Sequence, residues 1–113
     1  MNSSTPRYDE WFGEYTADRG ALAHLHFVKL TEAFSSKPLT LDCHCKKPYY
    51  AYVYPAEPYK IYLCRVFWVA PAIGTDSQAG TLIHEMSHFD VVAGTDDWAY
   101  GQEAARALAD KYP

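Results

Sequence analysis

The sequence predicts an α+β fold, because helical patterns occupy both ends of the chain and strand patterns occupy its middle. The chain has 113 residues, the length of one domain, so a single domain spanning residues 1–113 is expected. Hydrophobic residues make up 49% and charged residues 21%, a balance typical of a globular protein rather than a disordered one.

The N-terminal third predicts two helices. Thr5 is a suitable N-cap and Pro6 suits the first helical position of the first helix. Its aromatic residues recur at spacings of three and four: Tyr8, Trp11, Phe12 and Tyr15. A second helix is expected after Gly20, with an approximate apolar stripe from Leu22 to Phe34, and Pro38 ends it.

The middle of the chain predicts four short strands, because it is rich in β-branched and aromatic residues between proline-containing turns. Their expected ranges are 39–45, 50–54, 60–64 and 66–69. A small antiparallel or mixed sheet follows, and the alternating tyrosines of residues 50–54 share one of its faces.

The C-terminal third predicts helices again. Residues 75–78 have the form of a capping box, and a helix is expected from about residue 76 to residue 89. The alanine-rich stretch 100–112 predicts a last helix.

Charge and hydropathy exclude several classes of partner. The net charge is −4, so no basic excess is available to bind nucleic acid or an anionic membrane surface. The longest apolar runs, such as residues 66–72, are too short to span a bilayer. The sequence gives no indication of the oligomeric state.

The sequence His84-Glu85-Met86-Ser87-His88 has the form HExxH. On a helix, residues four apart share a face, so both imidazoles can bind one metal while Glu85 acts as a general base. The simpler alternative is a surface helix with two solvated histidines. A catalytic zinc also needs a third protein ligand, and Glu103, Asp96 and Asp97 are the candidates.

The motif continues with GTxDxxYG over residues 94–101, and the combination resembles the aspzincin (deuterolysin) metallopeptidases. Several upstream stretches are similar to the peptidyl-Lys branch of that family: Thr5–Tyr8, Trp11–Gly13, Asp42–Cys45, Ala51–Pro55, Tyr62–Cys64, Phe67–Trp68 and Gly74–Leu82. The resemblance implies a zincin-like zinc metalloendopeptidase domain.

The resemblance also implies a role for each motif residue. His84, His88 and Asp97 match the ligands of one Zn²⁺ per chain, with water at the fourth position. Glu85 matches the general base, and Tyr100 matches the tyrosine that stabilises the oxyanion. Polypeptides are the implied substrates.

Lysine on the leaving-group side is the preference of one branch of the family, and the resemblance to that branch raises the same preference as a candidate here. The chain is expected to lack two flanking segments of the family, including a C-terminal stretch with the acidic residues that hold lysine. No residue of the sequence is therefore assigned to lysine selection. The alternative function is a truncated, catalytically weak or inactive zinc-binding remnant, or an interaction module.

The cysteines Cys43, Cys45 and Cys64 leave one thiol unpaired if two of them form a disulfide. With His44 they could also form a small structural zinc site, but a disulfide framework is favoured. The resemblance implies that Cys45 pairs with Cys64. The disulfide and the family imply a secreted protein, although residues 1–7 have no signal-like apolar stretch.

Overall fold

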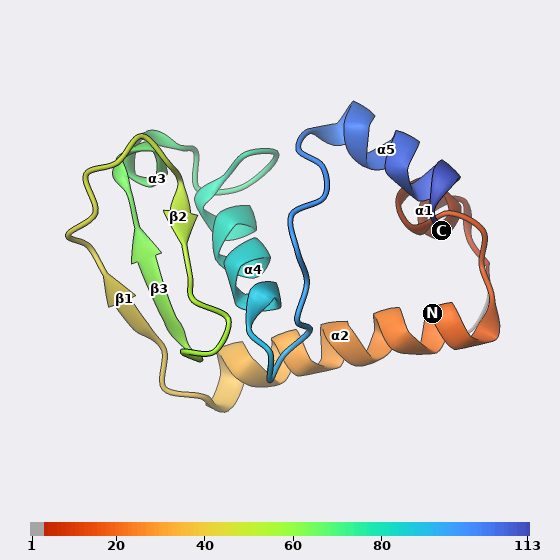
Figure 1. Cartoon of the computed structure of the whole chain (residues 1–113), viewed down its shortest axis with the longest axis horizontal. Helices are drawn as coiled ribbons and strands as arrows, with labels where there is room; N and C mark the ends of the chain where they lie inside the picture. Colours follow the sequence, from red (N-terminus) through yellow and green to blue (C-terminus); the bar gives the residue numbers. More distant parts are fainter. Residues whose placement is uncertain (1–3) are drawn as a thin grey trace. The chain divides into compact units, whose positions relative to one another are not determined.

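The computed structural model describes residues 4–113, and in this range helices precede and follow a small sheet along the chain, as predicted (Figure 1). The elements are α1 (Pro6–Phe12), α2 (Ala17–Ser36), β1 (Thr40–Asp42), β2 (Ala51–Tyr52), β3 (Lys60–Leu63), α3 (Arg65–Val69), α4 (Gln78–His88) and α5 (Gln102–Lys111). The fold is α+β. The chain forms two compact units, of which one comprises Val28–Thr95 and the other the residues on either side of that range.

The sheet is mixed and has the strand order β1-β3-β2, with β3 in the centre (Figure 1). β1 pairs with β3 in parallel, and β2 pairs with β3 in antiparallel orientation. Along β3 the burial alternates: Ile61 and Leu63 are buried, whereas Lys60 and Tyr62 are partly exposed. This alternation is the pattern of a strand with one face on the core.

The core of the Val28–Thr95 unit lies where α4 packs against β2 and β3. It is formed by Leu30, Ala33, Ile61, Leu63, Phe67, Met86, Phe89 and Val92. Met86 and Phe89 are completely buried, so the end of α4 is fixed from the core side. Truncating one such large side chain typically costs about 2–5 kcal/mol of stability.

The predicted fourth strand is wrong, because residues 65–69 form the short helix α3. Cys64 is the N-cap of this helix, and the backbone N–H groups of Arg65 and Val66 donate to carbonyls of Lys47 and Tyr49. Phe67 alone among these five residues is buried, which anchors the turn in the core. Tertiary contacts therefore override the strand preference of this β-branched and aromatic stretch.

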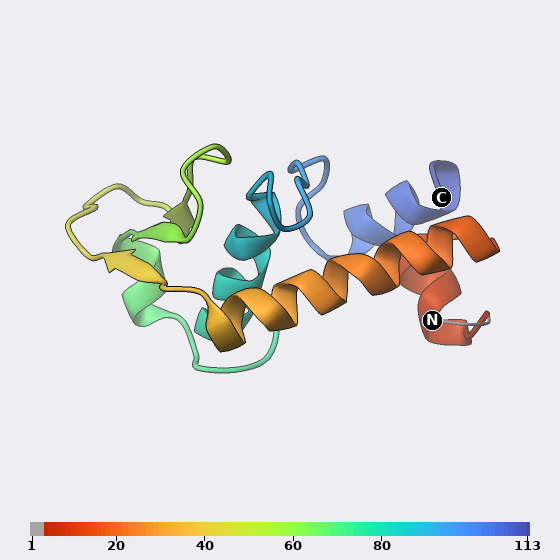
Figure 2. The same ribbon diagram turned by 90° about the horizontal axis from the view of Figure 1, so that it is seen from below.

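Helix α2 begins at Ala17, earlier than predicted, and runs without interruption to Ser36 (Figure 2). Only part of its predicted apolar stripe is buried: Leu30 belongs to the core, whereas Leu22 and Leu25 are exposed. Among the described residues 4–113, no helix combines the length and the apolar character needed to cross a membrane.

In the other unit, α1 packs against α5. The predicted cap is confirmed, because the Thr5 side chain accepts a hydrogen bond of 3.0 Å from the Tyr8 backbone N–H. Arg106 of α5 donates to Glu10 at 2.7 Å, and its guanidinium lies 4.7 Å from the centre of the Trp11 ring. Gly13 has a φ of 80°, and a Cβ atom there would collide with α5.

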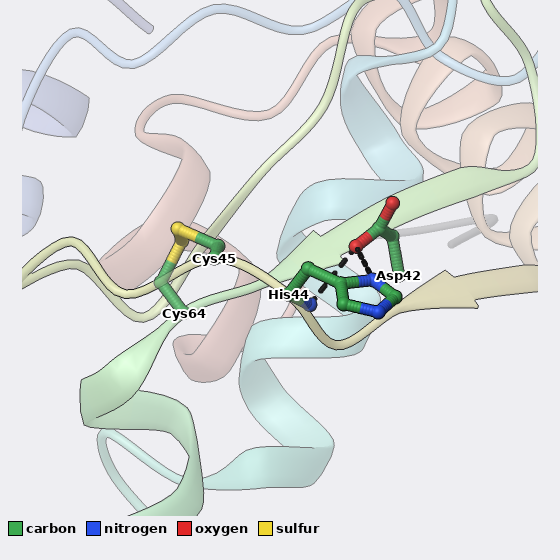
Figure 3. Close-up of a disulfide and its surroundings, with 4 residues drawn as sticks. All are labelled: Asp42, His44, Cys45 and Cys64. Atoms are coloured by element: carbon green, nitrogen blue, oxygen red, sulfur yellow. Dashed lines mark hydrogen bonds and ion pairs between the residues drawn. A yellow bond between two sulfur atoms is a disulfide. The ribbon is translucent and has the colours of Figure 1, made fainter.

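A disulfide joins Cys45 to Cys64, as the family resemblance implied (Figure 3). Cys43 is a free, exposed thiol. The two bonded sulfurs are not available as zinc ligands, so the alternative of a structural zinc site at these cysteines is wrong. Beside the bridge, the His44 backbone N–H donates to the Asp42 carboxylate at 2.9 Å and lowers the pKa of Asp42 (Figure 3).

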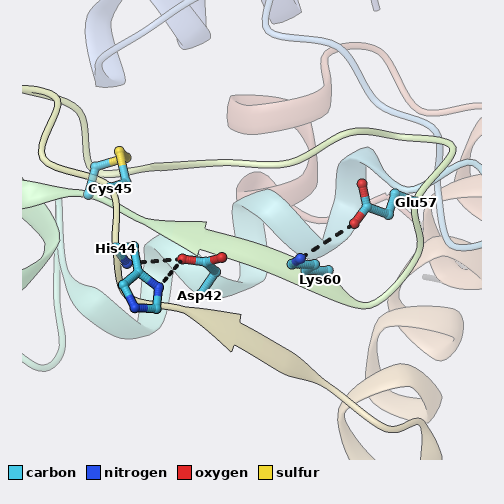
Figure 4. Close-up of polar contacts among 6 residues, drawn as sticks. Asp42, His44, Cys45, Glu57 and Lys60 are labelled. Atoms are coloured by element: carbon cyan, nitrogen blue, oxygen red, sulfur yellow. Dashed lines mark hydrogen bonds and ion pairs between the residues drawn. A yellow bond between two sulfur atoms is a disulfide. The ribbon is translucent and has the colours of Figure 1, made fainter.

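Further along the sheet, Lys60 pairs with Glu57 at 3.8 Å (Figure 4). Tyr62 donates to the same carboxylate at 3.2 Å, and its ring stacks on Tyr52 with an interplanar angle of 3°. This hydrogen bond and the cross-strand stacking give the outer face of the sheet an ordered aromatic surface. The predicted tyrosine alternation therefore serves strand pairing between β2 and β3.

Loss of the disulfide is expected to destabilise the protein by about 3 kcal/mol, because the bridge closes a loop between residues 19 positions apart. Urea unfolding of Cys45→Ser under oxidising conditions measures this loss. Cys43→Ser is the matched control and should keep the midpoint of the parent protein. Equal midpoints for Cys45→Ser and the control would contradict a stabilising bridge.

Candidate metal centre

Helix α4 carries the HExxH sequence, and its start is set by Ser77 rather than by Thr75 of the predicted capping box. The Ser77 hydroxyl accepts from the Gly80 backbone N–H at 3.0 Å and is almost completely buried. The preceding Asp76 has a positive φ of 50°, which breaks helical geometry before Ser77. The helix therefore begins at Gln78, and all five HExxH residues lie within it.

The two histidine side chains point at one another across one turn of α4. The Nε2 atoms of His84 and His88 are 3.1 Å apart, and their rings are nearly perpendicular. Two nitrogens bound to one tetrahedral zinc at about 2.05 Å would be about 3.3 Å apart. The pair therefore fits a zinc ion without rearrangement of the helix.

Glu85 completes a cluster with these histidines. One candidate ligand atom from each of the three residues lies within 4.8 Å of the other two. Glu85 is buried, with 7% of its surface exposed, whereas His84 is exposed. A buried carboxylate next to a solvent-accessible imidazole can accept a proton from a water molecule when a metal ion is bound by the imidazoles.

The other ring nitrogen of His88 fixes which nitrogen can bind metal. Nδ1 of His88 lies 2.6 Å from the backbone carbonyl oxygen of Thr95. Because a carbonyl only accepts, Nδ1 carries a hydrogen, and in the neutral imidazole the lone pair is therefore on Nε2. Backbone carbonyls commonly orient metal-binding histidines in this way.

The remaining predicted site residues follow this cluster in the chain. Asp97 and Tyr100 lie in the coil that leads to α5, and they belong to the unit that continues from Asp96. Asp97 as third ligand and Tyr100 as oxyanion donor stay predictions from the motif. Of the other two candidate ligands, Asp96 directly precedes Asp97 and Glu103 lies in the first turn of α5.

Sequence reasoning missed the part played by Ser87 and Thr95. Both contact the histidine pair. The Thr95 carbonyl accepts a hydrogen bond from the ring of His88, and the Ser87 hydroxyl donates one of 2.6 Å to the backbone carbonyl of His84. Ser87 occupies a variable position of HExxH, so the motif itself gives no signal for it. Thr95 is the second residue of GTxD, and its place in the motif was the available signal.

Comparison with known proteins gives a consistent picture. The aspzincin family model, described as lysine-specific metallo-endopeptidase, matches residues 1–113. An extracellular protease of Aeromonas hydrophila is 59% identical over 107 residues. A peptidyl-Lys metalloendopeptidase of Grifola frondosa is 48% identical over 113 residues. A solved zinc peptidase from Grifola frondosa superimposes with a TM-score of 0.91 at 44% identity.

The chain spans only part of each of these relatives. The matches cover 95% of this chain and 31% of the Aeromonas protein, and 98% of this chain and 32% of the Grifola sequence. The structural match covers 99% of this chain and 69% of the solved one.

Zinc is expected to stabilise the protein through His84 and His88. At a free zinc concentration of about 100 times the dissociation constant, the gain is about 2.7 kcal/mol. His88→Ala should abolish the zinc-dependent rise in unfolding temperature, and His24→Ala, on the exposed side of α2, should retain it. Thermal unfolding with and without zinc measures the effect, and an undiminished rise in His88→Ala would exclude this site.

Proposed function

This chain belongs to the aspzincin family of metallopeptidases, and from that premise we propose that it hydrolyses internal peptide bonds of polypeptides with the help of a zinc ion. The observation that carries the proposal is the facing pair of His84 and His88 nitrogens, 3.1 Å apart, beside the buried carboxylate of Glu85. Two neutral imidazoles and an adjacent acid are the donor set of a hydrolytic zinc site.

The ligand set proposed is His84, His88 and Asp97 around one zinc per chain, with a water molecule at the fourth position. The facing Nε2 atoms support the two histidines. Asp97 is supported by its place in GTxDxxYG, where it stands two residues after Thr95, whose carbonyl contacts His88. Asp96 stands one residue closer but does not occupy the motif's aspartate position.

The reaction divides the chemistry between the metal and two side chains. When bound, zinc polarises the scissile carbonyl and lowers the pKa of its water. The Glu85 carboxylate accepts the proton of the attacking water and delivers it to the departing amine. Such general acid–base catalysis typically raises the rate by about 10²- to 10⁴-fold. The Tyr100 hydroxyl donates a hydrogen bond to the oxyanion of the tetrahedral intermediate.

The substrates proposed are polypeptides cut with lysine on the leaving-group side. Relatives from Grifola frondosa, Armillaria mellea and Pleurotus ostreatus are named peptidyl-Lys metalloendopeptidases. The Aeromonas relative is named an extracellular protease, without a stated residue preference. That name and the Cys45–Cys64 disulfide support an exported protein, because such bridges persist in oxidising compartments.

Removal of the proposed third ligand separates Asp97 from its neighbour. Asp97→Ala should weaken zinc binding strongly, because two histidines and water then remain to hold the ion. Asp96→Ala is the matched control, since it removes an exposed carboxylate one position away. Titration with a competing chelator measures both dissociation constants, and equal effects would reject the assignment of Asp97.

Replacement of the proposed base separates metal binding from catalysis. Glu85→Gln should retain zinc and lose most peptidase activity, because an amide cannot accept the proton of water. Tyr100→Phe should retain zinc and lose about 10²-fold in turnover, the effect of one oxyanion donor. Zinc content and casein hydrolysis are measured on the same samples, and parental turnover by Glu85→Gln would refute the mechanism.

Digestion of a reduced, denatured protein tests the lysine preference. New N-termini identified by mass spectrometry should begin mainly with lysine, and a chelator should abolish them. Chelator-sensitive cleavage before many residue types would contradict the lysine preference but retain the peptidase. Zinc binding without any cleavage would favour the alternative of an inactive remnant.

A further inference from the structure

The chain reverses immediately after α4 and returns to the side of the histidine pair. The backbone N–H groups of Val92, Ala93 and Gly94 all point at the Phe89 carbonyl, at 2.9, 3.2 and 3.0 Å. Gly94 has a positive φ of 58°, a conformation that glycine adopts at little cost. The Thr95 backbone N–H then donates to the Ser87 carbonyl at 3.1 Å, which returns Thr95 to the end of the helix.

Two hydroxyl groups connect this returning segment to both histidines. The Oγ atoms of Ser87 and Thr95 are 2.6 Å apart, and Ser87 Oγ also lies 2.6 Å from the His84 carbonyl oxygen. Thr95 Oγ1 lies 3.3 Å from His88 Nδ1, next to the shorter bond of 2.6 Å from that nitrogen to the Thr95 carbonyl.

The chemistry of the groups fixes which atom donates in each hydrogen bond of this series. A carbonyl only accepts, so the single hydrogen of Ser87 is donated to His84. Ser87 must then accept from the Thr95 hydroxyl, whose oxygen is left facing the Nδ1–H of His88. The bonds therefore run in one direction, from the His88 ring through Thr95 and Ser87 to the His84 backbone.

We propose that Ser87 and Thr95 are positioning residues that hold His88 in the orientation needed to bind the catalytic zinc, an inference that rests on the function proposed above. The bond between the two hydroxyls fixes residue 95, and the Thr95 carbonyl in turn fixes the ring of His88. Loss of such an outer contact typically weakens metal binding by about 10- to 100-fold.

Three variants test the positioning role in the whole chain. Ser87→Ala and Thr95→Val each remove one hydroxyl of the pair with little change in volume, and Thr95→Ser restores the hydroxyl without the methyl group. Ser35→Ala is the matched control, because the Ser35 hydroxyl makes a similar bond of 2.7 Å to the Thr31 carbonyl in α2. Zinc dissociation constants and the unfolding temperatures of the zinc-free proteins are measured for each.

Ser87→Ala and Thr95→Val should each raise the zinc dissociation constant by about 10-fold or more, while Thr95→Ser and Ser35→Ala retain the parental value. The visible spectrum of the cobalt-substituted protein should change in the first two variants and not in the last two, because it reports ligand geometry. The double variant should bind zinc about as weakly as either single one, since both remove the same bond.

The inference is overturned if Ser87→Ala and Thr95→Val bind zinc like the parent, even if their zinc-free forms unfold earlier, because the hydroxyls would then be only structural. Effects that multiply in the double variant would also overturn it, since the two residues would then act separately. Failure of the parent protein itself to bind zinc would instead refute the proposed function. The three failures are therefore distinguishable.

Discussion

The position of the two histidines depends on one constraint, which is that α4 is held in the core on one side and presents His84 and His88 on another. Residues four apart on a helix share a face, so backbone geometry places the two histidines next to each other. The completely buried Met86 and Phe89 prevent the helix from turning about its axis. The anchoring fixes the direction in which the histidine face points, while the helix spacing and the side-chain rotamers set the 3.1 Å between the two Nε2 atoms.

The same anchoring makes the chain reversal after α4 part of the site. The ring of Phe89 is buried in the core, and its backbone carbonyl accepts hydrogen bonds from three backbone N–H groups of the turn. One residue therefore belongs to both the core and the turn. The turn brings Thr95 back beside His88, where a backbone carbonyl selects the neutral tautomer with its hydrogen on Nδ1. Core packing and the orientation of the proposed ligand His88 are consequently coupled through Phe89 and Thr95, which are not among the proposed ligands.

Local patterns in the sequence predicted what local geometry determines. The histidine pair, the Thr5 cap and the central strand β3 were all predictable, because each depends on residues close together in the chain. Residues 66–69 were misassigned, since their helix depends on the distant carbonyls of Lys47 and Tyr49. The disulfide partner of Cys64 came from the family resemblance, because three cysteines alone allow several pairings.

The first two residues of the second motif, GTxDxxYG, have identifiable structural roles. Gly94 provides the positive φ at the end of the reversal, and Thr95 holds the ring of His88. With Thr95 fixed there, chain connectivity alone keeps the Cα atom of Asp97 within about 7 Å of the Cα atom of Thr95. Glu103, eight residues after Thr95, has no such restriction. A short tether lowers the entropy lost when a carboxylate is brought to a metal, which favours Asp97 over Glu103 as the third ligand.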